Sequence, residues 1–502
     1  MVKQPLLLWV LIFGMWLAAV QAVAAQSTAG SCQSTLASTT DCRNAPLTPR
    51  EAELLQRVQK LEERLNQLET RLSAAKDQEA SSMSRQKENT AGGQDGRLET
   101  AQSSSPSQDS SIPLRADSQA RPSDEHRALP DLLEGTTFSA AFDGYYGFNF
   151  NKPVGGVNLL RAYDVTSNSF NLNQTGVVIE RAANVEGGRR FGLRLDLMYG
   201  QATETLQGSA QNEPRPQVFR PLFQAYGTYI FPIGSGLTVD FGKMASPMGY
   251  ENNYTKDQMN YSRSLWFDFL PFYHYGLRSS YHFNSRVTLR YWLINGINQT
   301  EDFNGFKSHA VNLTVSLTPT VSWNLNYHVG REQRALAPDL NPAIPTLPTQ
   351  PGLSVTPVEP IPRGRMHIVD SYASWTATKK LLLVGEGDYV VNRFQETSVP
   401  SVVFGGAGYV RYQFTPQFSL ASRLEYLGDK GGLFSGKSQA LKEVSLTATY
   451  QFAEGFQTRL EYRRDFSNLP FFLTSVPGLL RKEQSTATLG LIWWFGGKQG
   501  AW

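Results

Sequence analysis

The stretch that decides the fold runs from residue 137 to residue 150 and reads TFSAAFDGYYGFNF. Every second residue from Phe138 to Phe150 is aromatic, Ala or Gly, and the residues between them include Ser139, Asp143 and Asn149. A repeat of about two residues belongs to a β-strand with one apolar face, whereas a helix repeats every ~3.6 residues. The stretch therefore predicts a strand that separates an apolar side from a polar side.

The same alternation returns at 191–199, 321–329, 418–426 and 444–452. Strands in soluble domains are commonly about 5–6 residues long. These are longer, and a tilted strand that crosses a bilayer needs about 9–11 residues. Short connections such as 283–287 alternate with long polar loops, as in outer-membrane barrels. The long loops are expected near 151–168, 200–219, 243–270, 296–305, 331–364, 393–402, 428–440 and 467–482.

This layout predicts an all-β fold, a transmembrane antiparallel β-barrel of about sixteen strands over residues 132–502. A barrel closes because every backbone N–H and C=O in hydrocarbon needs a partner. Two segments, 169–182 and 365–378, alternate poorly, which leaves fourteen or eighteen strands as alternatives. An even number of strands places the first and the last residue of the barrel on the side of the short turns.

Composition excludes several other classes of protein. Charged residues make up 18% of the 502 residues, and beyond residue 25 there is no apolar run of about 18, so a bundle of transmembrane helices is excluded. A net charge of +3 argues against a nucleic-acid partner. Two cysteines exclude a disulfide-rich scaffold. No His, Cys and Asp cluster has ligand spacing, so we expect no metal and no cofactor.

The N-terminus has the features of an export signal. Lys3 precedes an apolar stretch at 6–20 and small residues that end at Ala24, which predicts a signal peptide over 1–25. An uncleaved anchor is the alternative. The segment 26–48 holds Cys32 and Cys42, which in an oxidising compartment form a local disulfide or remain two free thiols.

Residues 49–76 are predicted to form a short coiled coil. Apolar residues alternate at spacings of four and three, and opposite charges at flanking positions favour a parallel partner. The alternative is a lone amphipathic helix on another surface. Residues 77–131 are rich in Ser, Gln and Gly and predict a disordered linker. The coiled-coil seam is Leu54, Val58, Leu61, Leu65, Leu68 and Leu72.

The strands of the barrel carry charges on the face opposite the apolar one. A midplane Arg or Lys that faced lipid would cost about 2–4 kcal/mol, so these charges are expected to face a water-filled lumen. The alternative is that pairs such as Arg423 with Glu425 only stiffen the wall. The lumen candidates are Arg194, Asp196, Asp240, Arg290, Arg423, Glu425, Glu443, Arg459, Glu461 and Arg463.

Several stretches resemble the outer-membrane β-barrel porins of the porin-2, OmpL-like family. They are 138–150 (FSAAFDGYYGFNF), 235–251 (SGLTVDFGKMASPMGYE), 260–267 (NYSRSLWF), 271–278 (PFYHYGLR) and 460–472 (LEYRRDFSNLPFF). The resemblance implies an outer-membrane pore for small solutes, with no catalytic residues to carry over. Similar porins also imply that the third long loop, 243–270, folds into the lumen, and that three copies assemble into a homotrimer.

Within this third long loop, Trp266 and Phe267 are expected as anchors, and the alternative is a loop that packs on the rim. The constriction candidates are Glu251, Lys256, Asp257, Arg263 and Asp268.

The leading hypothesis is a porin for passive diffusion of small hydrophilic solutes or ions. It would lie in the bacterial outer membrane, in contact with lipid and lipopolysaccharide, with its coiled coil in the periplasm. One alternative is an outer-membrane anchor whose coiled coil binds a periplasmic or cell-wall partner such as peptidoglycan. Another is an outer-membrane hydrolase, but none of the six histidines lies in a nucleophile motif.

Overall fold

A computed structural model describes residues 135–207, 213, 216–337 and 357–496 of the chain. The chain divides into two units, 1–117 and 118–502, and every described residue belongs to the second unit. The signal peptide with Ala24, the segment with Cys32 and Cys42, the coiled coil 49–76 and the linker 77–131 lie outside the described residues. They stay predictions.

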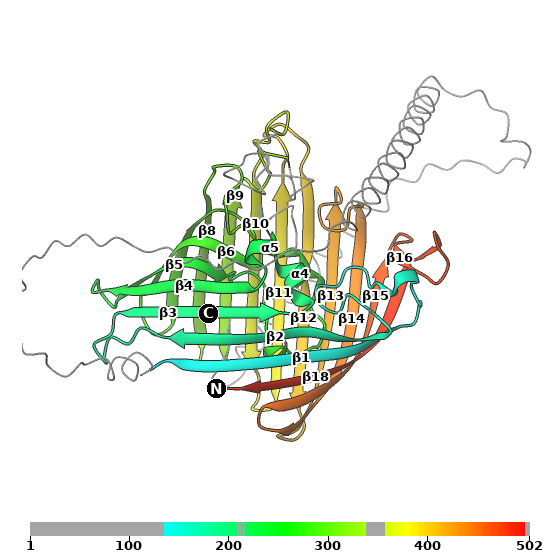
Figure 1. Cartoon of the computed structure of the whole chain (residues 1–502), viewed down its shortest axis with the longest axis horizontal. Coiled ribbons are helices and arrows are strands. Elements are labelled where there is room, and N and C mark those ends of the chain that lie inside the picture. Colours follow the sequence, from blue (N-terminus) through cyan, green and yellow to red (C-terminus); the bar gives the residue numbers. More distant parts are fainter. Residues whose placement is uncertain (1–134, 208–212, 214–215, 338–356, 497–502) are drawn as a thin grey trace, which may run out of the picture. The chain divides into compact units, whose positions relative to one another are not determined.

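The described residues form a closed antiparallel barrel of sixteen strands (Figure 1). The first strand, β1, pairs with the last strand, β18, from Ala140 opposite Phe495 to Asn149 opposite Thr486. No barrel strand keeps an unpaired edge, as hydrocarbon requires. The barrel strands are β1 Thr137–Asn149, β2 Ser169–Arg181, β3 Phe191–Tyr199, β4 Leu222–Phe231, β5 Leu237–Ala245, β6 Tyr273–His282, β7 Val287–Ile294, β8 Ser308–Thr318, β9 Val321–Gly330, β10 Met366–Thr376, β11 Leu381–Asn392, β12 Ser401–Gln413, β13 Phe418–Lys430, β14 Gln439–Ala453, β15 Phe456–Ser467 and β18 Glu483–Phe495.

The all-β barrel and its sixteen strands confirm the sequence-based prediction over fourteen or eighteen strands. The two poorly patterned segments are the strands β2 and β10. Strand β10 pairs along its length with both neighbours, whereas β2 pairs along its length with β1 but only from Thr175 to Arg181 with β3. In β2 the alternation is weak because the pairing with β1 shifts register at Asn173, so that Asn173 and Gln174 are both buried. The inner face of β2 also carries a small residue, Gly176, opposite the buried Met198.

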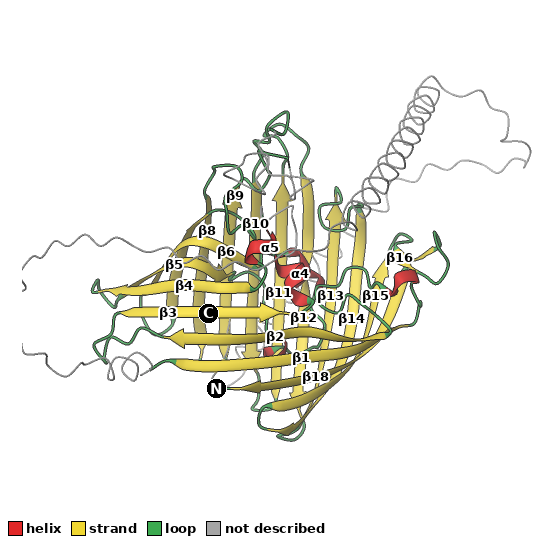
Figure 2. Cartoon of the chain, viewed as in Figure 1, coloured by secondary structure: helices red, strands yellow, loops and turns green. Residues whose placement is uncertain are grey.

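Short turns join the strands at one end of the barrel and long loops at the other. The turns are 182–190, 232–236, 283–286, 319–320, 377–380, 414–417 and 454–455. The long loops hold the few helices, which Figure 2 shows in red: η2 Val154–Gly156, α4 Ala202–Gln207, α5 Pro216–Phe219, η3 Thr255–Asp257 and α6 Leu265–Phe269. The last loop also carries a small two-stranded sheet, β16 Phe472–Leu473 with β17 Leu480–Arg481.

The outer face of the barrel is apolar and the inner face is polar. In β13, Leu424 is 60% exposed, while its neighbours Arg423 and Glu425 are buried. A soluble barrel would show the opposite arrangement, so the exposed face suits hydrocarbon. Near the turn end, Phe456 stacks between Phe452 and Trp493, with centroid distances of 5.2 and 4.8 Å. Such rings form the aromatic girdle at a membrane interface.

Helices do not provide a membrane span within the described ranges, since none of them is both long and apolar enough.

The outer face gives a prediction about depth. Leu424 lies at the middle of β13, and Leu317 lies at the turn end of β8, where it is 53% exposed. Leu424→Arg is expected to lower the free energy of unfolding by about 2–4 kcal/mol, and Leu317→Arg by about 0–1 kcal/mol, because the cost of a cation falls toward the interface. Guanidinium unfolding in phospholipid vesicles, followed by tryptophan fluorescence, measures both. Equal costs at the two positions would contradict a bilayer around the barrel.

Candidate functional site

Loop 246–272, between β5 and β6, crosses the space that the barrel encloses. The Nδ2 group of Asn326 in β9 donates to the carbonyl of Pro247 at 3.2 Å. The hydroxyl of Tyr261 donates to Asp143 in β1 at 2.8 Å. Since β1 and β9 stand opposite each other in the strand order, one loop that bonds to both must run through the interior. This is the loop that the sequence singled out as 243–270.

Charged side chains of the barrel wall bind the backbone of this loop. Glu461 in β15 accepts the N–H groups of Tyr261 and Ser262 at 2.6 and 3.0 Å. Arg459 donates to the carbonyls of Thr255 and Asn260 at 2.8 and 2.9 Å. An irregular loop has backbone groups that no neighbouring strand can satisfy, and a buried unpaired group costs about 1–3 kcal/mol. The wall charges supply these missing partners.

Two arginines on the wall extend the same network. Arg423 donates to Glu251 of the loop at 2.7 Å and to the carbonyls of Ser262 and Arg263 at 3.0 and 3.1 Å. Its Nε also lies 3.1 Å from Glu443. Both partner carboxylates and the guanidinium are buried, so the charges neutralise one another where water does not reach them.

Arg463 makes the second set of contacts. It pairs with Asp465 at 2.8 Å, lies 3.6 Å from Glu443, and donates to the hydroxyl of Ser262 and the carbonyl of Arg263. Arg423 and Arg463 therefore hold the same turn of the loop, at Ser262 and Arg263.

The strands place all ten lumen candidates on the inner face, and nine of them are buried, Arg290 being half-buried. The sequence predicts contact with water, but those on β13, β14 and β15 bind the loop or one another instead. Arg194 forms two hydrogen bonds with Asp196, and Asp240 pairs with Arg278 at 2.7 Å. The alternation of apolar and polar residues shows which face of the barrel a side chain occupies, but it does not show whether water or a loop covers that face.

Four of the five constriction candidates fall into two groups. Glu251 and Arg263 are buried; Arg263 donates to the carbonyl of Asn252 at 3.1 Å, and its guanidinium lies 4.8 Å from the ring centroid of Tyr163. Lys256 and Asp257 form an ion pair at 2.8 Å in η3, and Asp257 is the more exposed of the two.

The last candidate, Asp268, lies in α6 and is half-buried. The helix begins at Ser264, whose hydroxyl accepts the N–H of Phe267 at 2.8 Å. Trp266 is fully buried and donates to the carbonyl of Tyr426 at 3.2 Å. These contacts fix α6 against β13, so that Asp268 faces a cavity among the loops.

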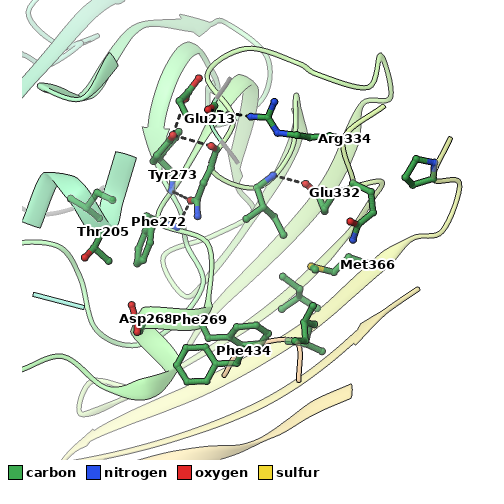
Figure 3. Close-up of a pocket in the computed structure, with 18 of the residues that line it drawn as sticks. Thr205, Glu213, Asp268, Phe269, Phe272, Tyr273, Glu332, Arg334, Met366 and Phe434 are labelled. Carbon is green, nitrogen blue, oxygen red and sulfur yellow. Dashed lines mark hydrogen bonds between the residues drawn. The ribbon is translucent and has the colours of Figure 1, made fainter. Parts of the chain in front are cut away.

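That cavity has a volume of about 640 Å³ and lies at the loop end of the barrel (Figure 3). Its lining includes Glu332, which accepts hydrogen bonds from His328, Ser308 and the N–H of Ile297 at 2.7–2.9 Å. Burial alone would raise the pKa of Glu332, but these hydrogen bonds, first of all that from His328, hold it below its usual value. Glu332 is therefore an ionised and fully engaged group.

Sequence reasoning missed a cluster of three carboxylates on the inner face of β10 and β11. Asp370 stands opposite Asp388 in the register of β10 and β11, and with Glu386 their oxygen atoms lie within 4.8 Å of one another. Glu386 accepts the N–H of Tyr250 at 3.0 Å, so this cluster also binds the loop. Weak alternation in 365–378 hid Asp370, and only the cross-strand register could have revealed the group.

His274 lies beside a serine hydroxyl group, as the hydrolase alternative would need. Its Nε2 lies 3.1 Å from the hydroxyl of Ser246, and its Nδ1 lies 3.1 Å from the carbonyl of Gly296. A hydroxyl beside an oriented imidazole can serve as a nucleophile pair. Here His274 is fully buried, however, and neither residue lines the cavity. The pair therefore does not open to that cavity.

A closed barrel with an apolar outer face and a polar interior defines an outer-membrane β-barrel. The chain belongs to the family described as Putative beta-barrel porin-2, OmpL-like, whose model matches residues 135–495. This family places the barrel in the outer membrane and in the porin class, as the resemblance in the sequence implied. No curated protein matches the chain.

Several solved structures are similar to this chain. OmpT of Vibrio cholerae is 10% identical, with 72% of this chain and 97% of that chain covered and a TM-score of 0.45. The outer membrane channel DcaP of Acinetobacter baumannii is 9% identical, with 72% and 97% covered and a TM-score of 0.45. An anion-selective porin from Comamonas acidovorans is 8% identical, with 72% and 99% covered and a TM-score of 0.45.

Two adjacent arginines test the role of the wall charges. Arg463 points inward and is 1% exposed, while Arg464 points outward and pairs with Glu483 at the surface. Arg463→Met removes one buried partner of Asp465 and Glu443, which keep Arg161 and Arg423, so it is expected to cost about 1–3 kcal/mol. Arg464→Met is expected to leave the free energy of unfolding nearly unchanged, because a surface ion pair contributes little. Guanidinium unfolding measures these costs.

Hydrogen exchange separates loop anchoring from general stability. In Arg463→Met, the amides of Tyr261, Ser262 and Leu265 are expected to exchange faster than those of the barrel strands. Exchange that stays unchanged in this loop would contradict its anchoring by Arg463.

Proposed function

We propose that this protein is a channel for passive diffusion of small hydrophilic solutes and ions across the outer membrane. The observation that carries the proposal is a closed barrel with a polar inner face, narrowed by a loop that is fixed inside it. A barrel of this strand number is wide enough to leave water inside beside such a loop. The solutes that pass would be small and polar, because the part of the inner face that the loop does not cover is polar.

The route proposed for solutes follows the inner face toward the turn end, away from the loop. Half-buried side chains lie there on neighbouring strands: Arg290 and Thr314 share a hydrogen bond of 3.1 Å, and Ser322 and Ser374 share one of 2.9 Å. Hydroxyl and guanidinium groups can exchange hydrogen bonds with water and with polar solutes as they pass.

We also propose a preference for small anions. Arg411 shares the inner face of β12 with Tyr409, since residues two apart point the same way, and like Arg290 it is half-buried. The acidic groups of the inner wall are for the most part paired or bonded to the loop, such as Asp240 with Arg278. Arg290 and Arg411 are therefore the charges that a passing ion would meet.

Conductance in a planar bilayer tests both parts of this proposal. Stepwise ion conductance from the purified protein is expected, and its absence would overturn the channel. In a KCl gradient, the double variant Arg290→Gln and Arg411→Gln is expected to shift the reversal potential toward cations, because two lumen charges are lost. Lys442→Gln serves as the control, since Lys442 lies on the outer face of β14. If the double variant leaves the reversal potential unchanged, Arg290 and Arg411 do not determine the ion selectivity.

The N-terminal region supports a second proposal. The heptads at 49–76 suit a parallel periplasmic bundle, and three copies would match a homotrimeric barrel. The same helix on its linker could instead bind peptidoglycan or a periplasmic protein, with the barrel as an anchor.

Deletion of residues 26–130, with the export signal kept, tests the homotrimer and the tether together. Conductance steps are expected to persist, because the barrel closes on itself, while cross-linked trimers become fewer as the bundle is lost. Cross-linking of the full chain that gives only monomer would contradict the trimer. Loss of attachment to the cell wall with unchanged conductance would instead support the tether.

A further inference from the structure

The cavity at the loop end has the size and lining of a site for small molecules. Its volume of about 640 Å³ lies within the range of about 300–1,000 Å³ that is usual for such sites. Its floor is apolar and includes Phe269, Met366, Val390 and Phe434. Figure 3 shows Phe269 and Phe434 together on this floor, with their ring centroids 5.3 Å apart. The channel as proposed needs no such apolar chamber.

One acidic group faces this chamber without a partner of its own. Among the described residues, the carboxylate of Asp268 forms no hydrogen bond and no ion-pair contact. Figure 3 places it beside Phe269 on the floor. A half-buried carboxylate beside aromatic rings is poorly hydrated, so a cation that pairs with it would gain more than it would in open water.

The other charged residues of the lining do not offset Asp268. Glu213 accepts the hydroxyl of Tyr273 and the N–H of Thr300, each at 2.9 Å, and its other carboxylate oxygen is buried without a described partner. Arg334 donates to the carbonyl of Glu213 at 3.3 Å, and its guanidinium lies 4.8 Å from the ring centroid of Phe303. With Glu332 ionised, the lining holds three acidic groups and one basic group within the described residues.

We propose that this cavity binds small organic amines, with the ammonium group against the carboxylate of Asp268 and the apolar body on Phe269, Phe434 and Met366. The rings favour a cation over a neutral head group, because an aromatic face attracts positive charge. A carboxylate ligand of the same shape would be repelled. The site would give the proposed channel a ligand at its loop end. Only this link to the channel rests on the proposed function; amine binding itself does not.

The protonation of Asp268 gives the site a pH dependence. Burial raises its pKa to about 7; Arg463 of β15 acts against this rise, and Asp164 of loop 150–168 adds to it. Glu213, Glu332 and Arg334 are the charged groups that share the cavity. Below this pKa the carboxyl is neutral and cannot pair with an ammonium. Affinity for an amine is therefore expected to rise about tenfold from pH 6 to pH 8, following the ionised fraction of Asp268.

Calorimetric titration of the full-length protein in detergent tests the site with three probes of one shape. These are 2-phenylethylamine, 2-phenylethanol and 3-phenylpropionate. The amine is expected to bind most tightly at pH 8, and Asp268→Asn to weaken it about tenfold. Glu204→Gln is the matched control, because Glu204 is an exposed acid on α4 that does not line the cavity.

The outcomes distinguish this site from the channel. Equal affinity for amine and alcohol, or unchanged amine binding in Asp268→Asn, would overturn the amine site. The comparison of probes on the unmodified chain keeps the test valid even where the variant fails to fold. Conductance recorded from the same preparation tests the channel separately. Conductance steps without amine binding would support the channel and overturn the amine site, whereas amine binding without steps would support the site and overturn the channel.

Discussion

The rest of this structure depends on one constraint: a backbone N–H or C=O that leaves water must find another partner. The constraint acts first on the strands, which close into a barrel because hydrocarbon offers no hydrogen bonds. It acts again on loop 246–272, which enters the enclosed space with an irregular backbone. There the partners are side chains: Glu461 and Arg459 take the place that a neighbouring strand has elsewhere.

This role of the wall charges explains why the inner wall is rich in both acidic and basic residues. A carboxylate that accepts backbone N–H groups and a guanidinium that donates to carbonyls are each costly to bury alone. Side by side they neutralise one another, as Arg423 does with Glu251 and Glu443. The wall is therefore divided in function. Strands β13 to β15 supply most of the charges that bind the loop, while the half-buried Arg290 and Ser322, nearer the turn end, remain open to the proposed solutes.

Much of the fold could be predicted from the sequence, because the bilayer imposes a simple rule on every strand. Alternation at Phe138 to Phe150 and the spacing of turns indicated the barrel, its strand number and the third long loop. The occupants of the interior could not be predicted in the same way. Arg423 and Glu461 were predicted to be lumen charges, because alternation indicates which face of the strand a side chain occupies but not whether a loop covers that face. Asp370 stayed hidden because its strand alternates weakly, and the loop-end cavity depends on several loops that approach only in the folded chain.

The position of the loop's partners along the chain has a consequence for biogenesis. Loop 246–272 is synthesised early, yet the side chains that hold it, from Arg423 to Arg463, come from strands near the C-terminus, up to 204 residues later. Such distant contacts form late, because the intervening chain must first be brought together. Until β13, β14 and β15 join the sheet, loop 246–272 lacks the arginines and glutamates that satisfy much of its backbone. The docking of the loop and the joining of these late strands to the barrel are thus expected to occur together.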